Sequence, residues 1–399
     1  MNKREVDKIL RDTAYIRVSG TKEEKRCAEY ICDKCRKIGI DAEVQPFKIA
    51  KYNTKKCSLL VNGRAIECTS YGGVGNCEAE GEIYYYLRNS NSSLKKCKDK
   101  IVVIDGYLGA KLHDDLFEYG AKAVITYCGS IADGDRDIDE RSIRYTTKGV
   151  LPAVNIHVSD AVEIIKKGKS AKIVIEQSEE YVDSYNVVAT LKGESDEALV
   201  LSAHYDTTPL SLGAYDNMSG CIALLYLAEY FCKIPHLKTI KFLWCGAEEI
   251  GLLGSINYCK ANNLQNDVLN VNLDMLGSVT GEFVAFSCAD EATEALLKDL
   301  FKKQRITGSV RYGIRSSDSN SFVYYGVPAI SYARYAAKGV SQMHNRYDTA
   351  DILSASRLLS DSKTIAKITE YIANSDVEFG ISEKIKTEVD NYMSRKKDL

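Results

Sequence analysis

The sequence predicts an α/β protein in which a doubly wound, mostly parallel β-sheet carries a smaller inserted α/β unit. Apolar runs and helical segments alternate along the chain from residue 186 onward. The apolar runs are continuous rather than alternating in polarity, which is typical of strands buried on both faces. A separate series of short strands and helices lies upstream, between residues 51 and 184. We therefore predict a main domain of residues 1–50 and 185–375, an insert of residues 51–184 and a C-terminal tail of residues 376–399.

The first segment of the main domain predicts two helices followed by a strand. The second helix, Glu23–Lys37, places Ala28, Ile31 and Cys35 on one face and ends before Gly39. Residues 40–49 alternate in polarity, which indicates a strand.

The insert contains its own short strands, separated by helical segments and one polar loop. A helix precedes Gly120 and a buried strand ends at Cys128, while residues 151–168 read as a strand followed by a helix. Residues 133–145 are charged, and we expect an exposed loop there. The other expected strands are Ile83–Tyr86, Ile101–Ile104 and Ala171–Ile175.

The second part of the main domain supplies most of the large sheet. Its expected strands are Val187–Leu191, Ala198–Ala203, Ile240–Cys245, Leu269–Leu273 and Ala329–Tyr332. Its expected helices are Ser219–Cys232, Ala292–Gln304 and Ser354–Asn374. In such sheets the functional site lies at the carboxyl ends of the strands. The last residues end in SRKKDL, which predicts a charged tail, helical or frayed.

The composition argues against several classes of partner. The net charge of −2 over 399 residues gives no bulk attraction to nucleic acid or to an anionic membrane. Apolar runs stay short of the roughly 18 residues that cross a bilayer, and the N-terminus is charged from its third residue, which is not typical of a signal peptide. We expect a cytoplasmic protein whose 13 cysteines are free thiols. The cluster CAEYICDKC lacks a second CxxC and a nearby histidine, so a structural role is favoured.

Ligand-type side chains follow the expected strands, where a site is anticipated. His204 and Asp206 follow one strand, Glu248 and Glu249 another, and Asp274 a third. Further candidates lie in two loops, Asp216 in GAYDNMSG and His344 with Asp348 in MHNRYDTAD. Imidazole with carboxylate suits Zn²⁺, with Co²⁺ or Mn²⁺ as possible substitutes.

The number of candidates predicts two metal ions rather than one. Any one of these residues is equally well explained as a solvated turn or strand end. Together, five are too many for a single tetrahedral zinc with an open position, and they fit two ions that share a bridging carboxylate. The five are His204, Asp216, Glu249, Asp274 and His344. On extended backbone Glu248 and Glu249 would point in opposite directions, so one can bind metal while the other acts as a base.

The stretches that carry these residues resemble the M28 family of zinc peptidases. They occur in the family's order as NVVATLKG, LSAHYDT, GAYDNMSG, FLWCGAEEIGLLGS, VNLDMLG, GVPAISY and MHNRYDTAD. The segment from TKEEKRC to QPF resembles the family's opening helices. KDKIVVIDG, EYGAKAVITY and LPAVNIHVSDAVEII resemble a protease-associated domain. The resemblance implies a zinc-exopeptidase-like fold with an inserted protease-associated domain.

The resemblance also implies roles for individual residues. His204 and Asp274 would bind one zinc, Glu249 and His344 the other, and Asp216 would bridge both. Asp206 would hydrogen-bond His204 and fix its tautomer. Glu248 would be the general base, and the Asp216–Asn217 peptide bond would be cis.

One position departs from the family pattern. Many relatives have a tyrosine immediately before the last zinc histidine, where its hydroxyl helps to bind the oxyanion. This chain has Met343 there. Tyr312 or Tyr332 is a candidate to replace it.

The activity that the resemblance implies is release of N-terminal amino acids from peptides by a two-zinc aminopeptidase. One alternative is a glutaminyl-cyclase-like acyltransferase, whose relatives tend to lack the residue equivalent to Asn217. A second is a glutamate-carboxypeptidase-like exopeptidase, for which Arg311, Arg315 or Arg334 would bind a substrate carboxylate. A third is a receptor-like binding protein, which would be expected to have lost a ligand or the base.

Overall fold

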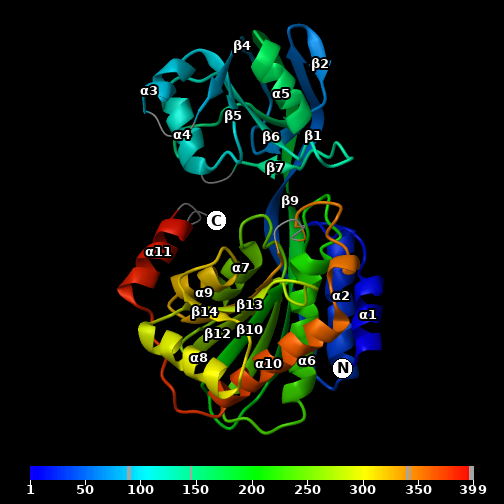
Figure 1. The fold of residues 1–399 in the computed structure, drawn as a ribbon, viewed down its shortest axis with the longest axis vertical. Coiled ribbons are helices and arrows are strands. Elements are labelled where there is room, and N and C mark those ends of the chain that lie inside the picture. The colour runs from blue at the N-terminus through cyan, green and yellow to red at the C-terminus, as the bar shows by residue number, and fades with distance from the viewer. Residues whose placement is uncertain (88–90, 144–145, 338–339, 341–342, 395–399) are drawn as a thin grey trace. The chain divides into compact units, whose positions relative to one another are not determined.

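The chain folds into two compact units. The computed structural model describes residues 1–87, 91–143, 146–337, 340 and 343–394. Unit 1 comprises Met1–Ile49 and Asp183–Ser394, and unit 2 comprises Ala50–Val182. The chain passes from one unit to the other within two long strands, β1 (Ala42–Val61) and β9 (Ser170–Leu191). Both are labelled in Figure 1.

Unit 1 is built on a doubly wound sheet, as predicted. Its strand order is β14-β13-β15-β12-β10-β11-β9. The pairs β10–β11, β10–β12, β12–β15 and β13–β14 are parallel, whereas β13–β15 and β9–β11 are antiparallel. The strands are β10 (Ala198–His204), β11 (Thr239–Cys245), β12 (Asp267–Leu273), β13 (Glu282–Cys288), β14 (Ser309–Tyr312) and β15 (Ala329–Tyr335). Sequence reasoning missed β13 and β14.

Helices cover both faces of this sheet because successive strand residues point to opposite sides. Leu201 and Ala203 of β10 and Trp244 of β11 lie in one apolar core, with residues of α6 and α10. Val200 of β10 and Leu243 of β11 lie in another, with residues of α7 and α9. The helices are α1 (Lys3–Asp12), α2 (Lys22–Lys37), α6 (Ser219–Phe231), α7 (Leu253–Ala261), α8 (Glu291–Lys303), α9 (Ser319–Tyr324), α10 (Ala355–Ala373) and α11 (Glu383–Met393), with short helical turns η2 (Ala214–Met218) and η3 (Ala350–Ile352).

The C-terminal tail contains a docked helix. In α11 the Ser382 side chain accepts the N–H of Ile385. Ile385, Val389 and Met393 recur every four residues, so they share one face, and all three are buried. Of the two expected forms of the tail, helical and frayed, the structure shows the helix, and it packs against α9 (Figure 1).

Unit 2 has its own sheet and core. Its strands are β2 (Arg64–Ile66), β3 (Thr69–Gly72), β4 (Cys77–Tyr86), β5 (Lys100–Ile104), β6 (Ala123–Cys128), β7 (Arg141–Ser142) and β8 (Ala153–His157), with helical segments α3 (Asn91–Leu94), η1 (Lys95–Cys97), α4 (Ala110–Glu118) and α5 (Val158–Lys167). The pairs β4–β5, β5–β6 and β6–β8 are parallel. The expected loop at 133–145 contains the short strand β7, and its residues 144–145 lie outside the described residues.

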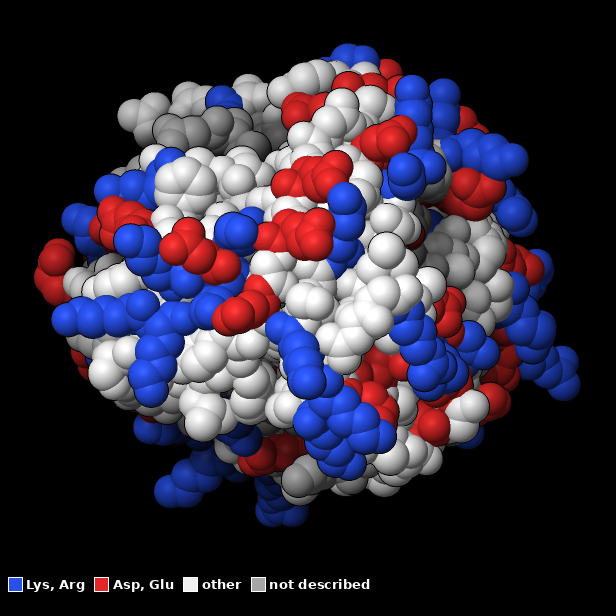
Figure 2. All heavy atoms as spheres, turned by 90° about the horizontal axis from the view of Figure 1, so that it is seen from above, with Lys and Arg blue, Asp and Glu red and all other residues white. Residues whose placement is uncertain are grey.

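The remaining general expectations concern thiols, membranes and surface charge. All thirteen cysteines are free thiols, and Cys27, Cys32 and Cys35 are buried along α2. Within the described residues, helices that are both long and apolar enough to cross a membrane are absent. On the face shown in Figure 2, basic and acidic side chains are interspersed.

Candidate metal centre

The five candidate ligands converge at the carboxyl ends of parallel strands. His204 is the last residue of β10, and Asp274 directly follows β12. Asp216 lies in η2, between β10 and α6. Glu249 follows β11 and His344 follows β15 along the chain. Because β11 and β12 both pair in parallel with β10, their carboxyl ends meet at one edge of the sheet.

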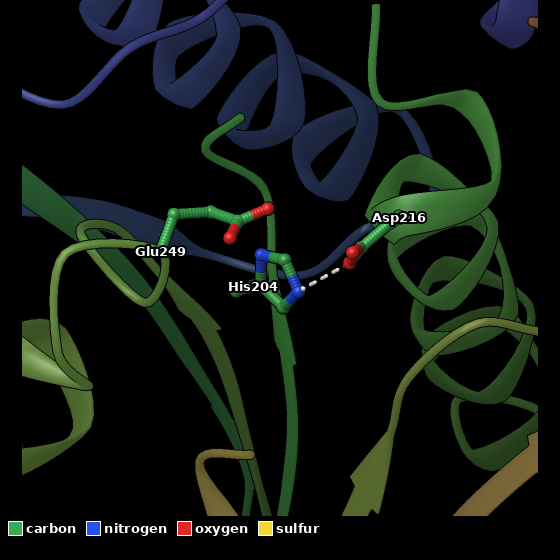
Figure 3. A group of neighbouring side chains, drawn as sticks. All are labelled: His204, Asp216 and Glu249. Carbon is green, nitrogen blue, oxygen red and sulfur yellow. Dashed lines mark ion pairs between the residues drawn. The ribbon is translucent and has the colours of Figure 1, made fainter. Parts of the chain in front are cut away.

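Asp216 lies between the two histidines. Its Oδ1 is 3.1 Å from Nε2 of His204, and its Oδ2 is 3.1 Å from Nε2 of His344. Next to His204, Oδ1 of Asp274 lies 3.7 Å from Nε2 of that histidine. Next to His344, Oε2 of Glu249 lies 3.1 Å from Nε2 of that histidine. The ligand atoms thus form two groups that share Asp216. Figure 3 shows His204, Asp216 and Glu249 converging from separate elements.

The donor set fits metal ions. His204, Asp216 and Glu249 each offer a ligand atom within 4.8 Å of the others. Around a tetrahedral zinc with bonds near 2.1 Å, donor atoms lie about 3.4 Å apart, close to the separations seen here. Nε2 of His204, Oε1 of Glu249 and Oδ1 of Asp274 are buried without a hydrogen bond to any described residue. Buried polar atoms left in this state cost free energy unless a cation binds them.

The cluster carries an excess of buried acids, which shifts its pKa values. Burial, and then the charge of Asp216, raises the pKa of Glu249 to about 7. Although burial opposes it, hydrogen bonds to Asp216 and Glu249 raise the pKa of His344 to about 11. Burial raises the pKa of Glu248 well above its usual range, despite the opposing effect of His204. Burial thus favours the neutral carboxyls of Glu248 and Glu249, and a cation bound beside them would favour their ionised forms instead.

The adjacent glutamates lie in a turn. β11 ends at Cys245, and Ala247 has a positive φ of 54°. Glu248 and Glu249 follow it, and the N–H groups of Gly251 and Leu252 both donate to the Glu248 carbonyl, so the chain turns here instead of continuing as a strand. The backbone N–H groups of Glu248 and Glu249 donate to Asp206 at 3.0 and 3.2 Å, which holds both residues in place.

Asp206 therefore has more contacts than the sequence indicated. Its Oδ1 lies 3.5 Å from Nδ1 of His204, on the side expected for a group that orients the imidazole. Its Oδ2 also accepts the hydroxyl of Ser19 at 3.0 Å. One fully buried carboxylate thus connects the end of β10, the turn with the two glutamates and the segment before α2.

Asp274 is held by residues to which sequence reasoning gave no such role. The Ser317 hydroxyl donates to Oδ2 of Asp274 at 2.7 Å. Arg315 donates to the Asp274 carbonyl at 2.8 Å, and its Nη2 lies 3.3 Å from Oδ2. Arg315 is buried and pairs with a protein carboxylate, as do Arg311 with Glu282 and Arg334 with Asp361. The sequence of residues 315–318, RSSD, matches no motif that would predict these contacts.

Asn217 fixes the loop of Asp216 to the end of β12. The Asp216–Asn217 peptide bond is cis, as expected. The Asn217 amide donates to the Leu273 carbonyl at 3.0 Å, and its Oδ1 accepts the N–H of Met275 at 3.0 Å. A side chain at Gly220 would collide with the Leu273 carbonyl and with Asn217, so this close approach requires glycine.

The two tyrosines expected near the oxyanion lie elsewhere, which corrects that expectation. The Tyr312 hydroxyl bonds to Ser382 and to Glu291, the latter at 2.9 Å. The Tyr332 ring is fully buried and stacks on Phe283, with centroids 5.8 Å apart. Successive side chains of a strand point to opposite faces of the sheet, and Tyr332 lies on the face of β15 that packs in the core.

A doubly wound sheet whose strand ends gather histidines and carboxylates defines this chain as an α/β protein with a candidate metal centre. Residues 186–369 match the model of peptidase family M28. This segment contains all five candidate ligands.

The chain is similar to named peptidases. It is 29% identical over 282 residues to "Aminopeptidase YwaD" of Bacillus subtilis, covering 66% of this chain and 58% of that protein. It is 25% identical over 283 residues to "Probable lipoprotein aminopeptidase LpqL" of Mycobacterium tuberculosis, covering 66% and 55%. The chain thus spans little more than half the length of these relatives. The fold matches the solved structure of BSAP, a zinc aminopeptidase from Bacillus subtilis, with a TM-score of 0.78, 23% identity and coverage of 94% and 96%.

Proposed function

We propose that this chain is a zinc-dependent aminopeptidase that releases N-terminal amino acids from peptides. The observation that carries the proposal is the placement of Asp216, whose two carboxylate oxygens each face one histidine at 3.1 Å. A shared carboxylate between two ligand groups is what a pair of neighbouring metal ions requires. The names of the relatives support the proposal, since both are called aminopeptidases and BSAP is called a zinc aminopeptidase.

Two zinc ions fit the proposed site, with Co²⁺ or Mn²⁺ as possible substitutes. His204, Asp274 and Asp216 would hold one, and His344, Glu249 and Asp216 the other. Zinc bound there supplies Lewis-acid polarisation of a carbonyl and lowers the pKa of water. Ser317 and Arg315 keep Asp274 oriented, and Asp206 keeps His204 oriented.

Glu248 is the proposed general base. It is adjacent to the ligand Glu249, and its backbone is held by Asp206. Its carboxylate takes a proton from the attacking water and returns that proton to the leaving amine. The excess of carboxylates also favours the α-ammonium group of a peptide with a free N-terminus, which would restrict cleavage to the first residue.

The insert is the second part of the proposal. We propose that residues 51–184 form a protease-associated-like module, because unit 2 has its own sheet and apolar core while all five ligands lie in unit 1. Its removal should change the preference for peptide length more than hydrolysis of a small chromogenic substrate. Thirteen free thiols favour a reducing compartment, and we propose the cytoplasm.

The test is hydrolysis of matched substrates by the purified full chain. Aminoacyl p-nitroanilides and short peptides with free N-termini should be cleaved when zinc is present and spared after chelation. Peptides with an N-terminal acetyl group should resist cleavage, and peptides with a C-terminal amide should not. Cleavage that requires a free C-terminus would indicate the carboxypeptidase alternative, and ammonia release from N-terminal glutamine would indicate the cyclase. Zinc binding without turnover of any substrate would favour the receptor-like alternative.

A further inference from the structure

The C-terminal helix α11 packs beside the turn that carries the proposed base. Val389 and Met393 of α11 lie in one apolar cluster with Leu252 and Ile256. The backbone N–H of Leu252 donates to the carbonyl of Glu248 at 2.9 Å. The cluster therefore contacts the same turn whose backbone holds Glu248, and apolar side chains anchor α11 there.

Tyr392 of this helix contacts the segment that precedes α9. Its hydroxyl lies 2.6 Å from the Ser316 hydroxyl. Ser316 is exposed, and its two neighbours, Arg315 and Ser317, both hydrogen-bond to Asp274. The Tyr392 hydroxyl thus lies at the open side of a segment whose buried side supports a metal ligand. Tyr392 itself is partly exposed.

Nearby acidic groups also affect the Tyr392 hydroxyl. Burial raises the pKa of Tyr392 to about 12; the hydrogen bond with Ser316 opposes this rise, and the charges of Glu248 and Asp318 add to it. The phenol is therefore protonated at neutral pH and is a hydrogen-bond donor in a region rich in acceptors. The apolar side chains of Ile385, Val389 and Met393 also dock α11.

We propose that α11 forms one wall of the peptide-binding site and that the Tyr392 hydroxyl donates a hydrogen bond to a backbone carbonyl of the bound peptide beside Glu248. A backbone carbonyl is the acceptor common to all peptide substrates, so this contact would act on peptides of any sequence. The inference rests on the proposed aminopeptidase function and adds a substrate-binding residue to it.

The experiment replaces the hydroxyl while keeping the ring. Tyr392→Phe should lower kcat/KM for tripeptides by about three- to tenfold, the usual effect of losing one hydrogen bond. The zinc content and the melting temperature should be unchanged. Tyr312→Phe is the matched control, because the Tyr312 hydroxyl bonds to Ser382 at the other end of α11. We expect Tyr312→Phe to retain kcat/KM within about twofold, an effect smaller than one hydrogen bond.

The outcomes separate binding from support of the metal centre. If Tyr392 acted only through Ser316 and Asp274, excess zinc would restore Tyr392→Phe, and that restoration would overturn the inference. Equal losses in both variants would assign the effect to docking of α11 and would also overturn it. Unchanged kcat/KM in Tyr392→Phe would also overturn the inference. A wild-type chain without peptidase activity would instead refute the proposed function.

Discussion

The carboxylate of Asp348 accepts the backbone N–H of Asp216 at 3.1 Å. The same carboxylate accepts the N–H of Tyr215 at 2.7 Å and faces the Ser211 hydroxyl at 3.2 Å. Asp348 thus fixes the loop that presents Asp216 to both histidines, although it touches neither histidine through any described contact.

Asp348→Asn should weaken zinc binding by about 10- to 100-fold, because supporting groups of metal ligands contribute on that scale. An amide retains the shape but can accept fewer hydrogen bonds from the two N–H groups. Zinc affinity by competition with a chromogenic chelator measures the effect. Asp351→Asn, at an exposed position three residues along, is the control and should match wild type. Wild-type zinc affinity in Asp348→Asn would contradict the role given to this carboxylate.

Substitution of Asp216 should remove both metal ions, whereas substitution of Asp274 should remove one. The reason is that Asp216 faces both histidines, while the ion pairs of Asp274 involve only His204 of the two. Elemental analysis after dialysis should find about two zinc per wild-type chain, one in Asp274→Ala and close to none in Asp216→Ala. Equal zinc content in the two variants would rule out Asp216 as the shared ligand.

Glu248→Gln and Glu249→Gln should fail for different reasons. Glu248→Gln keeps its shape but cannot take a proton, so kcat should fall by about 10²- to 10⁴-fold while zinc stays bound. Glu249→Gln weakens a ligand, so added zinc should partly restore its activity. Rates measured across a zinc titration distinguish the two variants. Rescue of Glu248→Gln by zinc, without rescue of Glu249→Gln, would reverse the assignment.

Glu24 should make the protein less stable as the pH rises from about 4.5 to about 8. Burial raises the pKa of Glu24 from its ordinary value of 4.5 to about 8. Below pH 4.5 the carboxyl is neutral in both states. Between pH 4.5 and about 8, Glu24 ionises in the unfolded chain but stays neutral in the folded protein, so the free energy of unfolding falls as the pH rises. Above about pH 8 the carboxyl is ionised in both states, and the free energy of unfolding falls no further on its account. Each pKa unit corresponds to about 1.4 kcal/mol.

The check compares melting temperatures of wild type and Glu24→Gln by calorimetry across this range. The amide stays neutral, so the advantage of Glu24→Gln over wild type should grow from pH 4.5 to 8 and then level off. Glu29→Gln, at an exposed position of the same helix, should follow wild type. A difference that does not change with pH would show that Glu24 ionises in the fold as it does in the unfolded chain.

The sequence predicted the strands and candidate ligands that depend on local patterns of apolar and polar residues. Continuous apolar runs identified β10, β11, β12 and β15, and the candidate ligands followed from their positions after those strands. Contacts made by distant residues were not predictable in this way. Asp348 meets Asp216 across 132 residues, and Tyr392 meets Ser316 across 76. Strands β13 and β14 were missed; β14 lies at the edge of the sheet, is four residues long and is only partly buried, which gives a weak apolar signal.

The position of the only tryptophan gives unit 1 a built-in optical reporter. Trp244 is fully buried in β11, stacked near Phe242, and its indole N–H donates to the Cys221 carbonyl at 3.4 Å. Because the chain has one tryptophan, its fluorescence comes from a single known place, four residues before Glu248. Emission at short wavelength would report an intact sheet, and a shift to long wavelength would report water reaching β11. Unfolding of this sheet can therefore be followed by fluorescence, separately from any event in unit 2.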